Sequence, residues 1–98
     1  MSRAAFELAP NRNPVSSERR TEILRDPGFG HYFTDNMIAI AYHVDRGWGP
    51  GALTAYEPLS LDPAASVLHY GQAIFEGFKA FHQPDGGVAT FRPEQNAR

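Results

Sequence analysis

The stretch LHYGQAIFEGFKAFHQPDGGVATFRPEQNAR, residues 68–98, contains aromatic side chains, the single lysine of the chain, a Gly-rich turn and two arginines. Within it, EGFKAFHQ and GVATFR alternate as two strands do, and PDGG between them supplies an Asp-Gly turn. RPEQNAR then has the features of a helix start, because Pro93 suits the first helical position and Glu94 complements the positive end of the helix dipole. The stretch therefore predicts a β-hairpin followed by a helix.

The predicted helix has only a few residues before the sequence ends at Arg98. Isolated helices shorter than about 12 residues are marginal in water. We therefore expect these 98 residues to be a truncated piece of a longer chain.

Upstream of this stretch, the sequence predicts an irregular arm, a helix and a strand. Residues 1–17 form the arm, since prolines lie among Asn, Arg and Ser. SERRTEILR predicts a short helix with Ser17 as its N-cap, ended by DPG. HYFTDNMIAIAYHV predicts a strand, and because both of its faces are apolar we expect it to be buried on both.

Two connecting segments complete the predicted α/β (α+β) fold. DRGWGPGALTAYEPLSLDP is rich in turn formers and predicts a long loop with little regular structure. PAASVLHYGQAIF predicts one or two helical turns that place Tyr70 at the start of a less regular stretch.

Composition indicates one soluble globular unit, with 42% hydrophobic residues and a formal net charge of -2. The near-neutral charge argues against nucleic acid or an anionic membrane as a partner. The chain has no cysteine, and we find no apolar run of signal-peptide or membrane-span length. We therefore expect a cytoplasmic protein.

The residue types that usually carry chemistry give no pattern by spacing alone. The spacing of the histidines matches no zinc-binding motif, and Ser66 lacks the G-x-S-x-G turn of a serine nucleophile. We therefore predict no metal site. The histidines are His31, His43, His69 and His82.

Lys79 and two arginines leave alternatives open. A buried Lys79 could form a Schiff base, whereas a Lys79 that reaches solvent or pairs with a carboxylate would be structural. Arg92 and Arg98 bracket the predicted helix start, where a guanidinium suits a phosphate, although an arginine in such a place is more often only solvated.

Three separated sequence motifs indicate a protein family, which the spacing of single residues does not. GFGHYFTDNM, LHYGQAIFEGFKAF with its DGG turn, and FRPEQNAR closely resemble, in this order, the N-terminal part of branched-chain amino-acid aminotransferases, the pyridoxal-phosphate enzymes of fold type IV. The resemblance runs from about Pro27 to Arg98. It implies that residues 18–98 are the N-terminal part of the small domain, incomplete here, and that the large cofactor domain is absent from this chain.

The resemblance also implies roles for individual residues. Arg98 matches the arginine that binds the phosphate of pyridoxal 5'-phosphate. Tyr70 matches a tyrosine that reaches the substrate pocket, typically across the dimer interface, and Phe29 and Phe75 match residues that line the pocket for the substrate side chain. Lys79 does not match the Schiff-base lysine, which lies beyond this chain in the family, so no catalytic residue is expected here and the chain alone should be inactive.

The implied reaction moves the amino group of leucine, isoleucine or valine to 2-oxoglutarate, giving 2-oxo acids and glutamate, in a homodimeric enzyme. An aromatic wall fits such substrates, because an apolar pocket discriminates by about 1 to 3 kcal/mol per methylene. A D-amino-acid aminotransferase or an aminodeoxychorismate lyase of the same fold is the alternative. A non-catalytic folding or dimerisation module is the alternative of another class.

Overall fold

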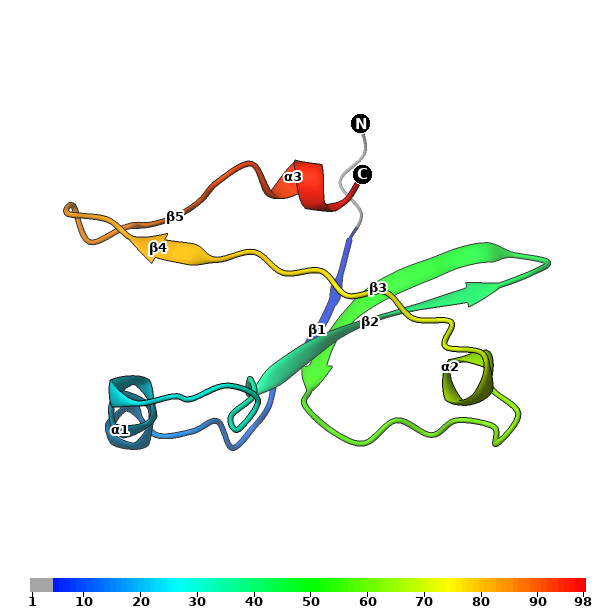
Figure 1. Cartoon of the computed structure of the whole chain (residues 1–98), viewed down its shortest axis with the longest axis horizontal. Helices are drawn as coiled ribbons and strands as arrows, with labels where there is room; N and C mark the ends of the chain where they lie inside the picture. The colour runs from blue at the N-terminus through cyan, green and yellow to red at the C-terminus, as the bar shows by residue number, and fades with distance from the viewer. Residues whose placement is uncertain (1–4) are drawn as a thin grey trace. The chain divides into compact units, whose positions relative to one another are not determined.

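The computed structural model describes residues 5–98 and divides into two compact units with the boundary after Leu59. The first unit has the element order β1-α1-β2-β3, and the second has α2-β4-β5-α3 (Figure 1). Both units combine helices with sheet, so the fold is a small α+β arrangement, as the sequence predicts.

The first unit is built on a three-stranded mixed sheet with strand order β1-β3-β2. β1 (Glu7–Ala9) runs parallel to the central strand β3 (Gly47–Ala55), and β2 (Asn36–His43) runs antiparallel to it. β2 and β3 form the long hairpin drawn in green in Figure 1. β1 lies within the arm that was predicted to be irregular, so that prediction is wrong for Glu7–Ala9.

β3 corrects the prediction of a long loop after residue 44. Its Gly- and Pro-rich first half is accommodated by a bulge, because the register shifts between Ile40 and Tyr42 and leaves Gly49 and Pro50 opposite Ala41. Pro50 also lies before the residues of β3 that pair with β1. Its missing N–H therefore interrupts no hydrogen bond between β3 and β1. Turn-forming residues therefore occur inside a central strand where its pairing is irregular.

Phe6 explains why a glycine is needed in the middle of β3. Its aromatic ring lies over Gly51, and a Cβ at that position would overlap the ring. Gly51 is accordingly buried, while Phe6 stays partly exposed. This contact packs the residue before β1 against the backbone of β3, beside the strand pairing of β1 with β3.

α1 (Ser17–Arg25) forms where the sequence predicts a helix, with a different cap. The Oγ atom of Ser16, not Ser17, accepts a hydrogen bond from the backbone N–H of Arg19 at 3.1 Å. The helix ends at Asp26, which caps it by donating to the carbonyl of Ile23, and Pro27 follows. The predicted stop at DPG is therefore confirmed.

A polar junction around Asp35 fastens the arm to the start of β2. The Asp35 carboxylate accepts from the backbone N–H of Val15 at 2.9 Å. Its backbone carbonyl accepts from the Asn11 side chain at 3.2 Å and from the N–H of Tyr56 at 2.9 Å. The Asn36 side chain accepts from the N–H of Asn11 at 2.7 Å. These bonds explain why the strand begins at residue 36 rather than at residue 31 as predicted.

The second unit contains a two-stranded hairpin between two short helices. β4 (Ala80–His82) pairs antiparallel with β5 (Val88–Thr90), which confirms the predicted hairpin in a shorter form. α2 (Ser66–His69) precedes it, and α3 (Pro93–Asn96) follows it with proline in its first turn, as predicted.

The connection of the hairpin is a turn over Gln83–Gly86 rather than a two-residue Asp-Gly turn. The N–H of Gly86 donates to the carbonyl of Gln83 at 3.0 Å, and the N–H of Gln83 donates to the carbonyl of Gly87 at 2.8 Å. Gly86 has φ 86, a left-handed conformation that favours glycine.

No large hydrophobic side chain is buried among residues 5–98. The prediction that β2 is covered on both faces is therefore wrong for this chain, since Ile38 is 55% exposed and Tyr42 is 61% exposed. Within the first unit, α1 does not pack extensively on the sheet. The apolar side chains of β2 that the sequence predicts to be buried are therefore exposed.

Candidate functional site

The four residues predicted to form a site are divided between the two units. Phe29 lies in the first unit, in the loop between α1 and β2, and is 94% exposed. Tyr70 at the C-cap of α2 is 85% exposed, and Phe75 in the irregular segment before β4 is 94% exposed. Arg98 follows Ala97, the C-cap of α3, and is also exposed.

Tyr70 and Phe75 lie on a segment shaped by turns rather than by regular structure. The backbone N–H of Tyr70 donates to the carbonyl of Ser66 at 2.9 Å, which closes α2. Gly71 then takes φ 64 and turns the chain away from the helix. The side chains of the following stretch, including Ile74 and Phe75, extend into solvent. They form an apolar surface rather than an enclosed pocket.

Glu76 joins this segment to α3, although 20 residues separate the two in sequence. Its Oε1 atom accepts from the backbone N–H of Gly77 at 2.8 Å and from the side-chain amide of Asn96 at 2.7 Å. The Asn96 amide also donates to the carbonyl of Gly77 at 3.1 Å. We call this set of three residues the Glu76–Asn96 clamp.

The clamp changes the protonation behaviour of Glu76. The hydrogen bond from the Gly77 N–H, followed by that from Asn96, lowers the pKa of the Glu76 carboxyl below its ordinary value. A lowered pKa means that the clamp contributes to stability above the pKa of an unfolded glutamate, about 4.3. That contribution is lost as the pH falls through the lower pKa of the folded state.

Arg92 and Arg98 flank α3, and Arg98 is the residue for which the phosphate role is predicted. Arg92 is the N-cap and has φ 45 and ψ 52, the left-handed conformation, so its backbone makes the turn into the helix. No carboxylate among residues 5–98 pairs with the Arg98 guanidinium. An unpaired guanidinium suits a phosphate, but Arg92 has no carboxylate partner among these residues either, so the choice of Arg98 rests on the sequence motif.

Lys79 lies just before β4 rather than in the middle of a strand. Its Nζ atom is 5.7 Å from the centroid of the Phe81 ring, so the ammonium and the ring share one side of the chain, as the predicted alternation requires. Lys79 is exposed, which favours the structural interpretation over a buried Schiff-base amine.

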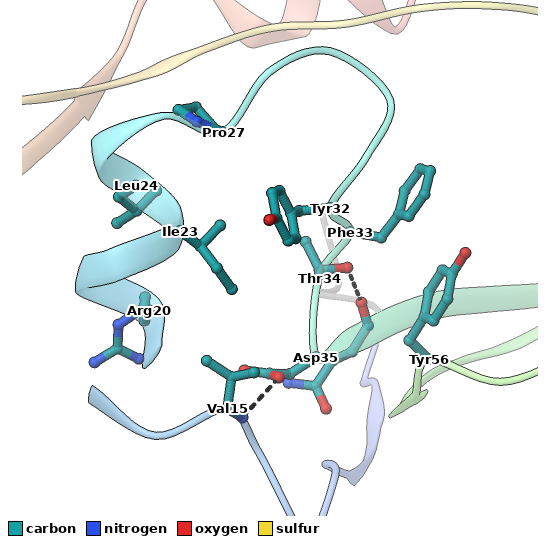
Figure 2. Close-up of a pocket in the computed structure, with 11 residues that line it drawn as sticks. Val15, Arg20, Ile23, Leu24, Pro27, Tyr32, Phe33, Thr34, Asp35 and Tyr56 are labelled. Atoms are coloured by element: carbon teal, nitrogen blue, oxygen red, sulfur yellow. Dashed lines mark hydrogen bonds between the residues drawn. The ribbon is translucent and has the colours of Figure 1, made fainter. Parts of the chain in front are cut away.

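The first unit contains a cleft of about 790 Å³ that the sequence did not predict (Figure 2). One wall is α1, from which Ile23 points toward Tyr32, and the other is the loop that leads into β2. Stacking of Phe33 on Tyr56, with ring centroids 5.7 Å apart, shapes the far end. Tyr32 is held in place by the guanidinium of Arg19, 5.9 Å from its ring centroid.

The cleft does not unite the predicted site residues. Its lining consists of Val15, Arg20, Ile23, Leu24, Pro27, Tyr32, Phe33, Thr34, Asp35, Asn36 and Tyr56. Neither Phe29 nor any residue of the second unit is among them. The polar groups of Asp35 and Asn36 are engaged by the arm, so the cleft is mainly an apolar gap between α1 and the loop.

The described part of the chain offers neither a metal-binding cluster nor a membrane-spanning helix. Residues 5–98 contain no group of three or more histidine, cysteine or acidic residues placed to hold a metal ion. None of the helices that these residues form has the length and apolarity needed to span a bilayer.

Comparison of the sequence with known proteins finds relatives whose names agree with one another. No protein-family model matches the chain. It is 55% identical over 96 residues to a protein named probable branched-chain-amino-acid aminotransferase from Streptomyces coelicolor. It is 51% identical over 92 residues to the branched-chain-amino-acid aminotransferase of Mycolicibacterium smegmatis, and 52% identical over 71 residues to branched-chain-amino-acid transaminase 1 of Bacillus subtilis.

These matches cover 98%, 94% and 72% of this chain, but only 26%, 25% and 20% of the respective relatives. The chain thus spans about a quarter of the length of the proteins that it matches. The family resemblance seen in the motifs is confirmed by three relatives with identities above half. The chain is therefore related in sequence to the N-terminal part of the branched-chain-amino-acid aminotransferases.

Proposed function

We propose that this chain is the N-terminal segment of a pyridoxal-phosphate-dependent aminotransferase that moves the amino group of leucine, isoleucine or valine to 2-oxoglutarate. The observation that carries the proposal is the 55% identity over 96 residues to a protein named for this activity. In this proposal the segment contributes binding groups, and the rest of the enzyme contributes the Schiff-base lysine. The 98 residues alone are accordingly inactive.

The exposed aromatic residues support a role in binding an aliphatic substrate side chain. Phe29 in the first unit and Phe75 in the second are both almost fully exposed, so each ring is free to serve as an aromatic wall against a substrate side chain. A wall of this kind favours leucine, isoleucine and valine because it shields their side chains from water. Tyr70 would reach the substrate pocket across a homodimer interface, as the family resemblance implies.

Arg98 is the residue that would hold pyridoxal 5'-phosphate. Its guanidinium has no carboxylate partner among residues 5–98 and can therefore donate charge-assisted hydrogen bonds to the phosphate. When bound, the cofactor supplies the electron sink for amino transfer. The fold type IV architecture and the cytoplasmic location remain predictions from the sequence.

The experiment uses the full-length protein that carries this chain, purified with pyridoxal 5'-phosphate. We expect leucine, isoleucine and valine to give the highest kcat/KM with 2-oxoglutarate as acceptor, measured as glutamate formed. Reactions without 2-oxoglutarate are the control. Preferred use of D-alanine would instead identify a D-amino-acid aminotransferase, and pyruvate release from aminodeoxychorismate would identify a lyase.

A further inference from the structure

The segment that carries Phe75 and the segment that carries Arg98 are held together by side-chain hydrogen bonds. Figure 1 shows α3 and the chain that precedes β4 within the second unit. The hairpin connects them through the backbone, and the Asn96 side-chain amide joins them directly by donating to the Glu76 carboxylate at 2.7 Å and to the Gly77 carbonyl at 3.1 Å. Asn96 is half-buried in this contact, while Glu76 is exposed.

The clamp lies next to both predicted binding residues. Phe75 directly precedes Glu76, and Arg98 is two residues beyond Asn96. Two residues span at most about 7 Å of extended chain, so fixing Asn96 restricts where the Arg98 guanidinium can reach. Fixing Glu76 restricts the Phe75 ring in the same way.

The donor and acceptor pattern of the clamp is specific. The Asn96 amide uses both of its N–H bonds, one toward the Glu76 carboxylate and one toward the Gly77 carbonyl. The same carboxylate also accepts a hydrogen bond from the backbone N–H of Gly77. The Glu76 side chain therefore accepts from its own segment and from α3. An aspartate at position 96 would have no donor and would place a second negative charge against Glu76.

The turn into α3 is also held in an unusual backbone conformation. Arg92 is the one residue other than glycine with positive φ among residues 5–98. Such a conformation is unfavourable for a residue with a Cβ and persists only where its surroundings enforce it. The clamp, four residues further on, is a contact that can hold α3 in this orientation.

We infer that Glu76 and Asn96 are positioning residues, which set the substrate wall at Phe75 and the phosphate-binding guanidinium at Arg98 relative to each other. This inference rests on the proposed function. In this inference, neither Glu76 nor Asn96 touches substrate or cofactor. Their effect passes through Phe75 and Arg98, so a change that breaks the hydrogen bonds between Glu76 and Asn96 should weaken substrate and cofactor binding together.

The test compares variants of the full-length enzyme. In Asn96→Asp, the dissociation constant for pyridoxal 5'-phosphate, from absorbance titration of the apoenzyme, and the KM for leucine should both rise roughly three- to tenfold, while kcat changes less. Glu76→Gln should stay close to the parent, since the amide oxygen can still accept from Gly77 and Asn96. The double variant Glu76→Gln with Asn96→Asp should regain part of the loss, because the side-chain amide introduced at position 76 can donate to the new carboxylate.

Gln83→Ala is the matched control. Its side-chain amide also donates to a backbone carbonyl, that of Phe81 at 3.4 Å, but it lies in the hairpin turn away from Phe75 and Arg98. Both constants should stay within about twofold of the parent, as expected for a bond with no positioning role.

Two results would overturn the inference. In the first, the enzyme transaminates leucine but Asn96→Asp leaves both constants unchanged. In the second, the double variant recovers nothing and all losses follow a fall in the unfolding midpoint, which indicates a general structural role. A parent enzyme that does not transaminate leucine would overturn the proposed function, and with it the roles that the clamp serves.

Discussion

Arg98 is the residue at which the proposed cofactor site can be tested most directly. Arg98→Ala in the full-length enzyme removes a charge-assisted contact to a phosphate dianion, and such contacts contribute about 1.5 to 3 kcal/mol. The dissociation constant for pyridoxal 5'-phosphate should therefore rise roughly ten- to a hundredfold. The measurement is an absorbance titration of the apoenzyme.

Two further variants make the Arg98 result interpretable. Arg98→Lys should recover only part of the affinity, because an ammonium keeps the charge but lacks the planar fork of the guanidinium. Arg92→Ala is the control. Alanine carries the same Cβ as arginine and therefore meets a similar cost at φ 45, so only the side chain is changed. An Arg98→Ala enzyme with the affinity of the parent would show that the phosphate is held elsewhere.

At the scale of single residues, the sequence motifs predict roles for residues that neither residue spacing nor the structure would have selected. Phe29, Tyr70 and Phe75 are exposed and form no cavity among the described residues, so geometry alone gives them no role. The Glu76–Asn96 clamp had no signal in the sequence, because 20 residues separate the partners and the contact depends on how α3 folds back.

Among the secondary-structure elements, the β4–β5 hairpin gives a direct test of local backbone chemistry. Gly86 has φ 86, and no atom lies within 4 Å of the position that a Cβ would take. Gly86→Ala should therefore cost about 1 to 2 kcal/mol through the left-handed backbone alone. In the full-length protein the amide of Gln83, bonded to the Gly87 carbonyl at 2.8 Å, should exchange hydrogen roughly 5- to 30-fold faster.

Gly86→Asn distinguishes a backbone effect from any other consequence of the substitution. Asparagine tolerates the left-handed conformation better than alanine, so its exchange rate should lie between those of the parent and the alanine variant. Equal exchange in the parent and in Gly86→Ala would mean that the turn does not keep this conformation in the full-length protein.

Predicted elements were found where a local signal was strong and missed where pairing overrode it. The stop at Asp26–Pro27 and the Pro93 helix start are local signals, and both were confirmed. β3 was missed because Gly49 and Pro50 indicate a loop, whereas the bulge opposite Ala41 lets them remain in a strand. Strand pairing joins segments distant in sequence, so local propensity cannot report it.

On the scale of the whole chain, the sequence predicts more buried apolar side chains than residues 5–98 bury. Alternation predicted β2 correctly, but the two covering layers that its apolar faces require are not formed by residues 5–98. Trp48, for example, packs edge-on against Tyr42 with ring centroids 5.0 Å apart and is still 71% exposed. In the proposed enzyme, the remaining part of the protein would cover these side chains.

Residues 1–98 expressed alone should therefore lack a cooperative fold. Ordering each residue costs about 1 to 2 kcal/mol of backbone entropy, and burial of apolar surface is the main term that offsets it. No large hydrophobic side chain among residues 5–98 is buried. We expect a broad urea transition by circular dichroism and strong binding of the dye ANS, whereas the full-length protein should unfold cooperatively and bind little dye. A sharp transition without dye binding would contradict this expectation and would favour the non-catalytic folding module, because a chain that stabilises itself must bury an apolar core of its own.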